Sequence, residues 1–255
     1  MNSETIGLVV FACVFSGALL GMLIRSWLPE HHVSGDARDV MKLGIGLIAT
    51  TTALVLGLLT ASAKSAFDTE NAEIRTSAAN LVLLDRTLAQ YGPEAAPIRA
   101  GVKQAVAKRI ELTWPASNDT PVKLDSAELQ HGGEMIEQSI RMLQPATDMQ
   151  KVLQAKAIAV TSDLLKSRWL VMGQASGSTI PVPFLVVVVF WLSVIFACFA
   201  MLAPPNRTLA AVLGLSALSV AAAVFLILEM DHPFNGLIRV SDQPLRYALS
   251  QIGGS

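Results

Sequence analysis

Four side chains in the apolar stretch 43–63 recur at helical spacing and combine hydroxyl with aliphatic chemistry. In chain order they are Thr51, Val55, Leu58 and Ser62, at positions i, i+4, i+7 and i+11, so a helix would place them on one face. Hydroxyl groups can exchange hydrogen bonds with an ion that is losing water, and a ring of Val and Leu can gate a narrow path by dewetting. Several copies that turned this stripe toward a shared axis would therefore line a pore with it.

Lys64 follows the stripe at the end of the apolar stretch. In a ring of copies, Lys64 would add positive charge at the pore mouth and favour anions. The alternative interpretation is that Thr50, Thr51 and Thr52 bond back to carbonyls of their own helix while the stripe faces lipid. On roughly the opposite face, small residues recur every four positions and predict close helix packing: Ala49, Ala53, Gly57 and Ala61.

The sequence offers little for other kinds of chemistry. No interior position of the apolar stretches carries Asp, Glu, Lys, Arg or His, whereas pumps and proton relays place ionisable groups there. The segment Glu30-His31-His32 with Asp36 is better interpreted as a solvated hairpin than as a metal site, and GxSxG, HExxH, CxxC, P-loop and GxGxxG motifs are lacking. We therefore expect no enzyme activity, no cofactor and no bound metal.

The distribution of charge indicates which elements must position the stripe. The 255 residues are 52% apolar and only 15% charged, whereas soluble domains are about a quarter charged. Of the 39 charged residues, 26 lie between Lys64 and Arg168, which leaves an apolar region on either side. This is the pattern of a membrane protein with one hydrophilic insert, and a net charge of −1 excludes nucleic-acid binding.

Four stretches are long enough to cross a hydrocarbon core as helices, and they are residues 6–24, 43–63, 182–202 and 209–228. The first is expected to be a retained helix and not a secretory signal, because no Lys or Arg precedes it and no small-x-small cleavage site follows. Gly17 and Gly21 in this stretch, and Ala210 and Gly214 in the fourth, provide small faces for helix packing.

The hydrophilic insert has the apolar periodicity of helices, in three stripes: Ile74, Ala78, Leu81, Leu88 and Tyr91; Ile98, Val102, Val106 and Ile110; and Met149, Leu153, Ala157, Val160 and Leu164. No linker separates Ala63 from Lys64, so we expect the second span to continue as a helix out of the bilayer. Tyr91-Gly92-Pro93 is expected to end that helix, and Gly132-Gly133 to form another break.

The predicted fold is therefore all-α. Transmembrane helices 1 and 2 lie in residues 1–63, a stalk-like extramembrane domain in 64–178, transmembrane helices 3 and 4 in 179–229, and an amphipathic tail in 230–255. After the fourth span, Pro233 halts the helix and the Asn-Gly236 pair favours a turn, in a segment that also holds Asp231 and Phe234. The tail is expected to dock either on the middle domain or along the membrane interface.

Positive charges near the span ends give two conflicting indications of orientation. Arg25 follows a first helix that no Lys or Arg precedes, which favours a cytoplasmic first hairpin. Over the whole chain, the side of the middle domain carries six such residues and the hairpin side four: Lys64, Arg75, Lys166, Arg168, Arg239 and Arg246 against Arg25, Arg38, Lys42 and Arg207. The larger count predicts that both termini and the middle domain lie in the cytoplasm, and the membrane is expected to be a bacterial inner membrane.

Three separated blocks of the chain resemble the bestrophin-like domain family of bacterial and plant membrane proteins. They are LGLLTASAKSAFD at 56–68, NLVLLDRTLAQYG at 80–92 and DHPFNG at 231–236. The family is distantly similar to bestrophins, which are homopentameric anion channels. The resemblance implies a homopentamer with a helical cytoplasmic domain and a pore neck formed by the second span. The chain departs from bestrophins where their calcium-holding acidic run would follow, since Leu237-Ile238-Arg239-Val240 stands there.

Two hypotheses for function follow from these patterns. The first is a homo-oligomeric, pentameric ion channel in the lipid bilayer, weakly anion-preferring, in which the second span lines the pore and Val55 and Leu58 form the gate. The second is a non-conducting or proton-motive stator or scaffold whose helical insert binds a partner, because the order of two spans, insert and two spans also resembles the proton-channel subunit of the flagellar motor.

Overall fold

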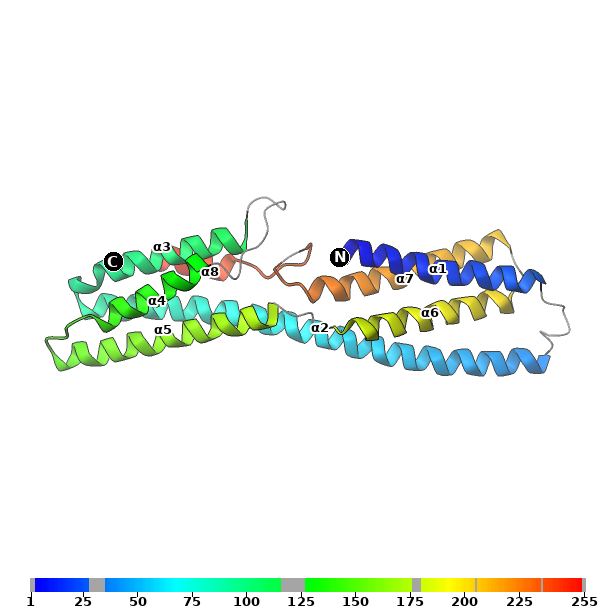
Figure 1. Ribbon diagram of the computed structural model, residues 1–255, viewed down its shortest axis with the longest axis horizontal. Helices are drawn as coiled ribbons and strands as arrows, with labels where there is room; N and C mark the ends of the chain where they lie inside the picture. The colour runs from blue at the N-terminus through cyan, green and yellow to red at the C-terminus, as the bar shows by residue number, and fades with distance from the viewer. Residues whose placement is uncertain are drawn as a thin grey trace. The chain divides into compact units, whose positions relative to one another are not determined.

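The computed structural model describes residues 3–27, 35–115, 127–175, 180–204, 206–234 and 236–253. Within these ranges every regular element is a helix (Figure 1): α1 Ser3–Trp27, α2 Gly35–Tyr91, η2 Pro93–Ala95, α3 Ala96–Thr113, α4 Ala127–Arg141, α5 Asp148–Ala175, α6 Val182–Leu202, α7 Arg207–Met230 and α8 Gln243–Gln251. Helices α1, α2, α6 and α7 are long and apolar enough to cross a membrane. The predicted all-α fold with four spans and a helical insert is confirmed.

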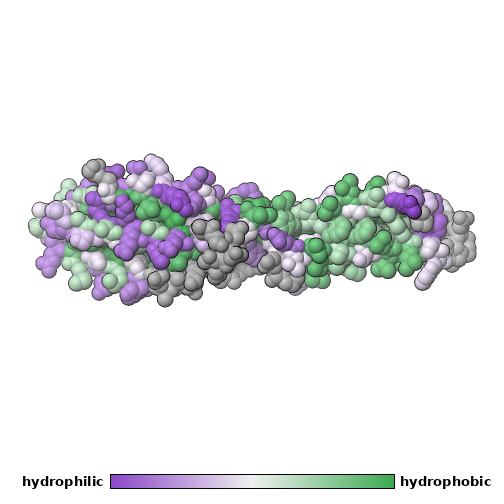
Figure 2. Space-filling view, turned by 90° about the horizontal axis from the view of Figure 1, so that it is seen from above, coloured by the Kyte–Doolittle hydropathy of each residue, from purple (hydrophilic) through white to green (hydrophobic). Residues whose placement is uncertain are grey.

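The chain divides into two compact units. We call Met1–Ala66 with Ser178–Asp231 the membrane unit, and Phe67–Gly177 with His232–Ser255 the helical unit. Helix α2 contributes to both, because it runs for 57 residues without a break, as the absence of a linker after Ala63 predicted. Figure 2 shows apolar residues over most of the visible surface of the membrane unit and mainly hydrophilic residues over the helical unit.

The membrane unit has an apolar core to which all four spans contribute. Its buried members include Val14 of α1, Leu59 of α2, Val188 of α6 and Val224 of α7, and α1 packs mainly against α6 and α7. Lipid tails are as apolar as these side chains, so close packing between helices, and not removal from water, has to hold the spans together. Small residues therefore decide how closely two spans approach.

Gly17 and Gly21 provide that close approach for α1. A Cβ added to Gly17 would lie 2.6 Å from the carbonyl oxygen of Ser193, and one added to Gly21 would lie 2.8 Å from the Cα atom of Ala197. Both neighbours are backbone atoms of α6 and cannot turn away as a side-chain tip would. The predicted use of this glycine pair for helix packing is confirmed.

We expect Gly21→Ala to destabilise the membrane unit, because the new methyl group would force α1 away from α6. Overpacking of this kind costs about 2 kcal/mol, which corresponds to a fall in the unfolding midpoint of about 6 °C for a chain of this size. Thermal unfolding of the purified protein in detergent measures the change. Gly101→Ala in α3 is the matched control, because a Cβ at Gly101 meets nothing within 4 Å and alanine favours helix. An equal fall in both variants would contradict this account of Gly21.

The helical unit has a second apolar core, built by the predicted stripes. Every member of the first stripe is buried, and so are Val102, Val106, Ile110, Leu153, Ala157 and Val160. The prediction for Met149 is wrong, since its side chain is 67% exposed. Met149 is the second residue of α5, which begins at Asp148, so it lies at the helix end, ahead of the first core residue of that helix.

Of the two breaks predicted by glycines, one is confirmed and the other is wrong. Helix α2 ends at Tyr91, and Gly92 has a φ of 134°, a backbone conformation that side chains disfavour. Gly132 and Gly133, by contrast, lie inside α4. A Cβ on Gly133 would lie 2.9 Å from Cδ2 of Leu165 in α5, so this glycine permits a close approach of two helices and makes no turn.

A buried ion pair connects three parts of the helical unit. Arg99 of α3 donates to both carboxylate oxygens of Asp85 in α2, with Nε at 2.8 Å from Oδ1 and Nη2 at 3.0 Å from Oδ2. The amide of Gly253, near the end of the chain, also donates to Oδ2, at 3.4 Å. Asp85 is almost fully buried, so these three donors replace the water that its charge would otherwise need.

The C-terminal tail docks on the helical unit, which settles the alternative that the sequence left open. The indole nitrogen of Trp114, which caps α3, donates to the carbonyl of Val240 at 2.8 Å. The Trp114 ring also meets Phe234 edge-on, with 5.9 Å between ring centroids. Further along the tail, Leu245 and Ala248 of α8 are fully buried and Leu249 is partly buried against the same core.

Candidate functional site

The residues of the proposed pore stripe lie along one flank of α2. Thr51 and Ser62 are exposed, and the Leu58 side chain is 63% exposed. Lys64 is also exposed, but it follows Ser62 by two positions on the same helix and so points about 160° away from it. Val55 differs, because it is half-buried and packs against the core of the membrane unit. The stripe therefore borders the core along one edge, and its other members point away from the three remaining spans.

A different side of α2 holds the helix in the membrane unit. Ile45, Thr52, Leu59 and Ala63 are buried there, at helical spacings of seven, seven and four. Thr52 directly follows Thr51 in the chain, so the two side chains point in directions about 100° apart. The core thus orients α2 and turns the stripe outward.

The threonine hydroxyls of α2 donate to carbonyls of the preceding turn. Thr51 donates to Leu47 at 3.0 Å, Thr50 to Gly46 at 2.8 Å and Thr52 to Ile48 at 2.7 Å. These hydrogen bonds within the helix, seen here in a single chain, are the ones predicted by the alternative interpretation, in which the stripe faces lipid. They leave the hydroxyl oxygens as acceptors, because each hydroxyl has only one proton to donate.

The small-residue stripe of α2 does not pack within the chain along most of its length. Ala53, Gly57 and Ala61 are exposed, and only Ala49 is half-buried. A Cβ added to Gly57 would meet nothing within 4 Å. The buried share of the most apolar window is 17% for α2 and between 28% and 33% for the other three spans. Helix α2 is therefore the span that its own chain covers least.

The turn after the fourth span begins where α7 ends, at Met230. Asp231 caps the helix, and its amide donates to the Ile227 carbonyl at 3.2 Å. Pro233 and Phe234 are buried, Gly236 has a φ of 99°, and the Val240 amide closes the segment by donating to the Pro233 carbonyl at 2.8 Å. These residues connect α7 to the tail.

The structure does not describe most of the candidate metal ligands near the first hairpin. Glu30, His31 and His32 lie outside the described residues, as does the side chain of Asp36. Among the residues that the structure does describe, no three His, Cys, Asp or Glu side chains come together as a metal site would require.

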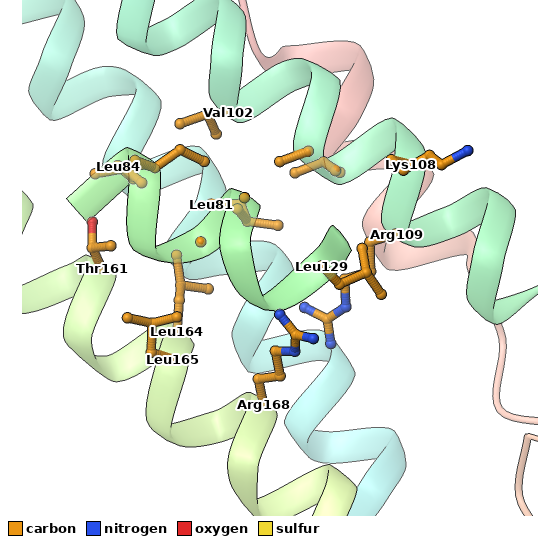
Figure 3. Close-up of a pocket in the computed structure, with 15 residues that line it drawn as sticks. Leu81, Leu84, Val102, Lys108, Arg109, Leu129, Thr161, Leu164, Leu165 and Arg168 are labelled. Atoms are coloured by element: carbon orange, nitrogen blue, oxygen red, sulfur yellow. The ribbon is translucent and has the colours of Figure 1, made fainter. Parts of the chain in front are cut away.

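A pocket in the helical unit was not predicted from the sequence. It has a volume of about 140 Å³ and lies between α2, α3, α4 and α5. In Figure 3 the guanidinium groups of Arg109 and Arg168 point toward one another at one end of the pocket, while Thr161 lies elsewhere on its wall. No spacing in the sequence indicates this pair, because Arg109 and Arg168 are on different helices and are brought together only by the fold.

Four apolar spans with an all-helical insert define a multi-pass integral membrane protein. The model of the bestrophin-like domain family matches residues 12–245, and the chain belongs to that family. A solved structure of a bacterial bestrophin homologue from Klebsiella pneumoniae, in a point-mutant form, has a similar fold, with a TM-score of 0.69 over 97% of this chain and 99% of that one at 12% sequence identity. No curated protein matches the chain in sequence.

Proposed function

We propose that this protein is a homopentameric, channel-like membrane protein with a weak preference for anions and no enzymatic activity. Helix α2 of each copy lines an axial pore, with Thr51, Val55, Leu58 and Ser62 facing the path and Lys64, on another side of the helix, at its mouth. Val55 and Leu58 form its gate. The membership in the bestrophin-like family supports a channel-like role.

The observation that carries this proposal is the outward flank of α2. Thr51, Leu58 and Ser62 are exposed in the single chain, and α2 is the least covered span. A ring of copies would cover this helix on both sides, with the small-residue stripe against a neighbour and the hydroxyl-aliphatic stripe toward the axis. No ionisable side chain lies in the interior of any span, which favours passive conduction over ion-coupled pumping.

The hydroxyl geometry explains why we propose only a weak preference for anions. Thr51 donates its proton to the Leu47 carbonyl, so an anion can be held there only after the hydroxyl turns toward the path. Lys64 carries its positive charge in every rotamer. The ring of Lys64 at the pore mouth therefore sets the preference, and the Thr51 ring contributes little to it.

We place the protein in a bacterial inner membrane, and the positive-charge count supports an orientation with the helical unit and both termini in the cytoplasm. Single cysteines placed in a chain that lacks Cys13 and Cys198 test this orientation. We expect Ser250→Cys, in the tail, to react with a membrane-impermeant maleimide only after the cells are permeabilised. Thr208→Cys, at the α6–α7 hairpin, should react in intact cells. Both residues are exposed, and the reverse labelling pattern would overturn the orientation.

The channel proposal is tested by the copy number and the current of the same preparation. We expect electron cryomicroscopy of the protein in lipid nanodiscs to show five copies with α2 around the axis. Planar bilayers should then show currents carried more by chloride than by sodium. A single subunit, or an assembly with the Thr51–Ser62 flank against lipid, would overturn the pore. Five copies without conductance, together with a protein that co-purifies through residues 64–178, would favour the scaffold.

A further inference from the structure

The pocket of the helical unit combines apolar walls with a cationic end. Its walls include Leu81, Leu84, Val102, Val106, Ile136 and Leu164. Arg109 of α3 and Arg168 of α5 stand at one end with their guanidinium groups facing one another (Figure 3). The neighbouring Lys108 turns its ammonium group away, and it pairs with Glu111 at 3.3 Å. An apolar chamber that ends in two cations has the chemistry of a site for an amphipathic anion.

Arg109 lies close enough to Arg168 for the two charges to interact. Within the described residues, no carboxylate forms an ion pair or hydrogen bond with Arg109, although its side chain is half-buried. Burial and the nearby charge of Arg168 lower the pKa of Arg109 to about 10, so it remains protonated at neutral pH. A charge held in this way is stabilised by a bound anion, and a guanidinium binds a carboxylate through two parallel hydrogen bonds.

We propose that this pocket binds a small amphipathic carboxylate, with the carboxylate between Arg109 and Arg168 and the apolar part among the leucine and valine side chains. The pocket volume of about 140 Å³ limits the apolar part to roughly the size of a benzene ring, which fills an apolar cavity of about 150 Å³. Aromatic carboxylates and aliphatic carboxylates of about six carbons fit this description. The site is independent of the proposed pore, because every residue that lines it belongs to the helical unit.

Equilibrium dialysis of the full chain in lipid nanodiscs tests the site with radiolabelled benzoate. We expect saturable binding of benzoate, at least tenfold weaker binding of its neutral analogue benzamide, and no competition by acetate, which lacks the apolar part. Benzamide that binds as tightly as benzoate would show an apolar pocket without anion recognition. The absence of saturable benzoate binding at millimolar concentration would refute the site.

Four variants locate the binding within the fold. Arg109→Gln and Arg168→Gln should each weaken benzoate binding at least tenfold, because each removes one of the two cations. Lys108→Gln removes the adjacent charge, which points away, and should leave binding unchanged. Ala105→Leu adds a side chain at a half-buried position of the pocket wall and should abolish binding without removing any charge. Equal effects of Arg109→Gln and Lys108→Gln would overturn the assignment.

Discussion

The Leu58→Ala variant should carry a current about tenfold larger than the wild-type protein at the same voltage and salt concentration. In the proposed pore, each copy places one Leu58 side chain in the constriction, where apolar walls strip water from a passing ion. Shortening all copies widens and rehydrates that segment. A tenfold change in rate corresponds to a barrier lowered by about 1.4 kcal/mol. Single-channel recordings in planar bilayers, with the same lipid for both proteins, measure the change.

The exposure of Leu58 makes this test informative. Its side chain is 63% exposed in the single chain, so its truncation opens no cavity in the core of the membrane unit. Val55, in contrast, packs against that core, and its truncation would mix a gating effect with a loss of stability. Leu215→Ala in α7 is the matched control, since Leu215 is 67% exposed on a different span. If Leu58→Ala and Leu215→Ala give the same current as the wild type, Leu58 is not the gate.

Most of the fold could be predicted from the sequence because two simple periodicities dominate it. Apolar runs of about 20 residues can only be helices in lipid, and 182–202 coincides with α6. In the helical unit, spacings of three, four and seven identified core residues such as Ile74 and Val106. These patterns depend on neighbours along one helix, and that information is present in the local sequence.

The sequence-based predictions that were wrong, and the features that were not predicted, concern places where two helices meet. The local sequence does not show which residue of another helix lies opposite a given residue. Gly133 had the composition of a turn, but Leu165 of α5 lies against it and the helix continues. Gly21 and Gly57 have the same residue type in two spans, yet only Gly21 contacts another helix of its own chain. The proximity of Arg109 to Arg168 could not be predicted for the same reason, since it depends on how the core places α3 and α5.

The pore stripe itself was predictable as a face of a helix, and its environment was not. The spacing of Thr51, Leu58 and Ser62 placed them on one side of α2, and the structure shows that this side is turned away from the other spans. Whether a residue on such a side faces lipid or another copy depends on the assembly. Lys64, which follows the stripe in the chain, provides an electrical test of the proposed pore mouth.

Lys64→Glu should reverse the ion preference, so that sodium carries more current than chloride. A unit charge about 8 Å from an ion on the axis contributes about 0.5 kcal/mol in water, and five of them contribute about 2.5 kcal/mol before screening. Salt at physiological strength, with a Debye length of about 8 Å, reduces this sum to about 1 kcal/mol. Lys64→Glu replaces each of the five positive charges in the ring by a negative one, so the barrier for an anion rises by about 2 kcal/mol. This corresponds to roughly a thirtyfold loss of anion permeability.

The reversal potential under a sodium chloride gradient measures this preference without depending on the number of channels in the bilayer. Lys64→Gln should give an intermediate value, because it removes the positive charge without adding a negative one. Lys151→Glu is the control for net charge, since Lys151 is an exposed residue of α5 that pairs with Asp148 at 2.8 Å. A reversal potential that shifts equally in Lys64→Glu and Lys151→Glu would mean that total charge sets the preference. One that shifts in neither would remove Lys64 from the pore mouth.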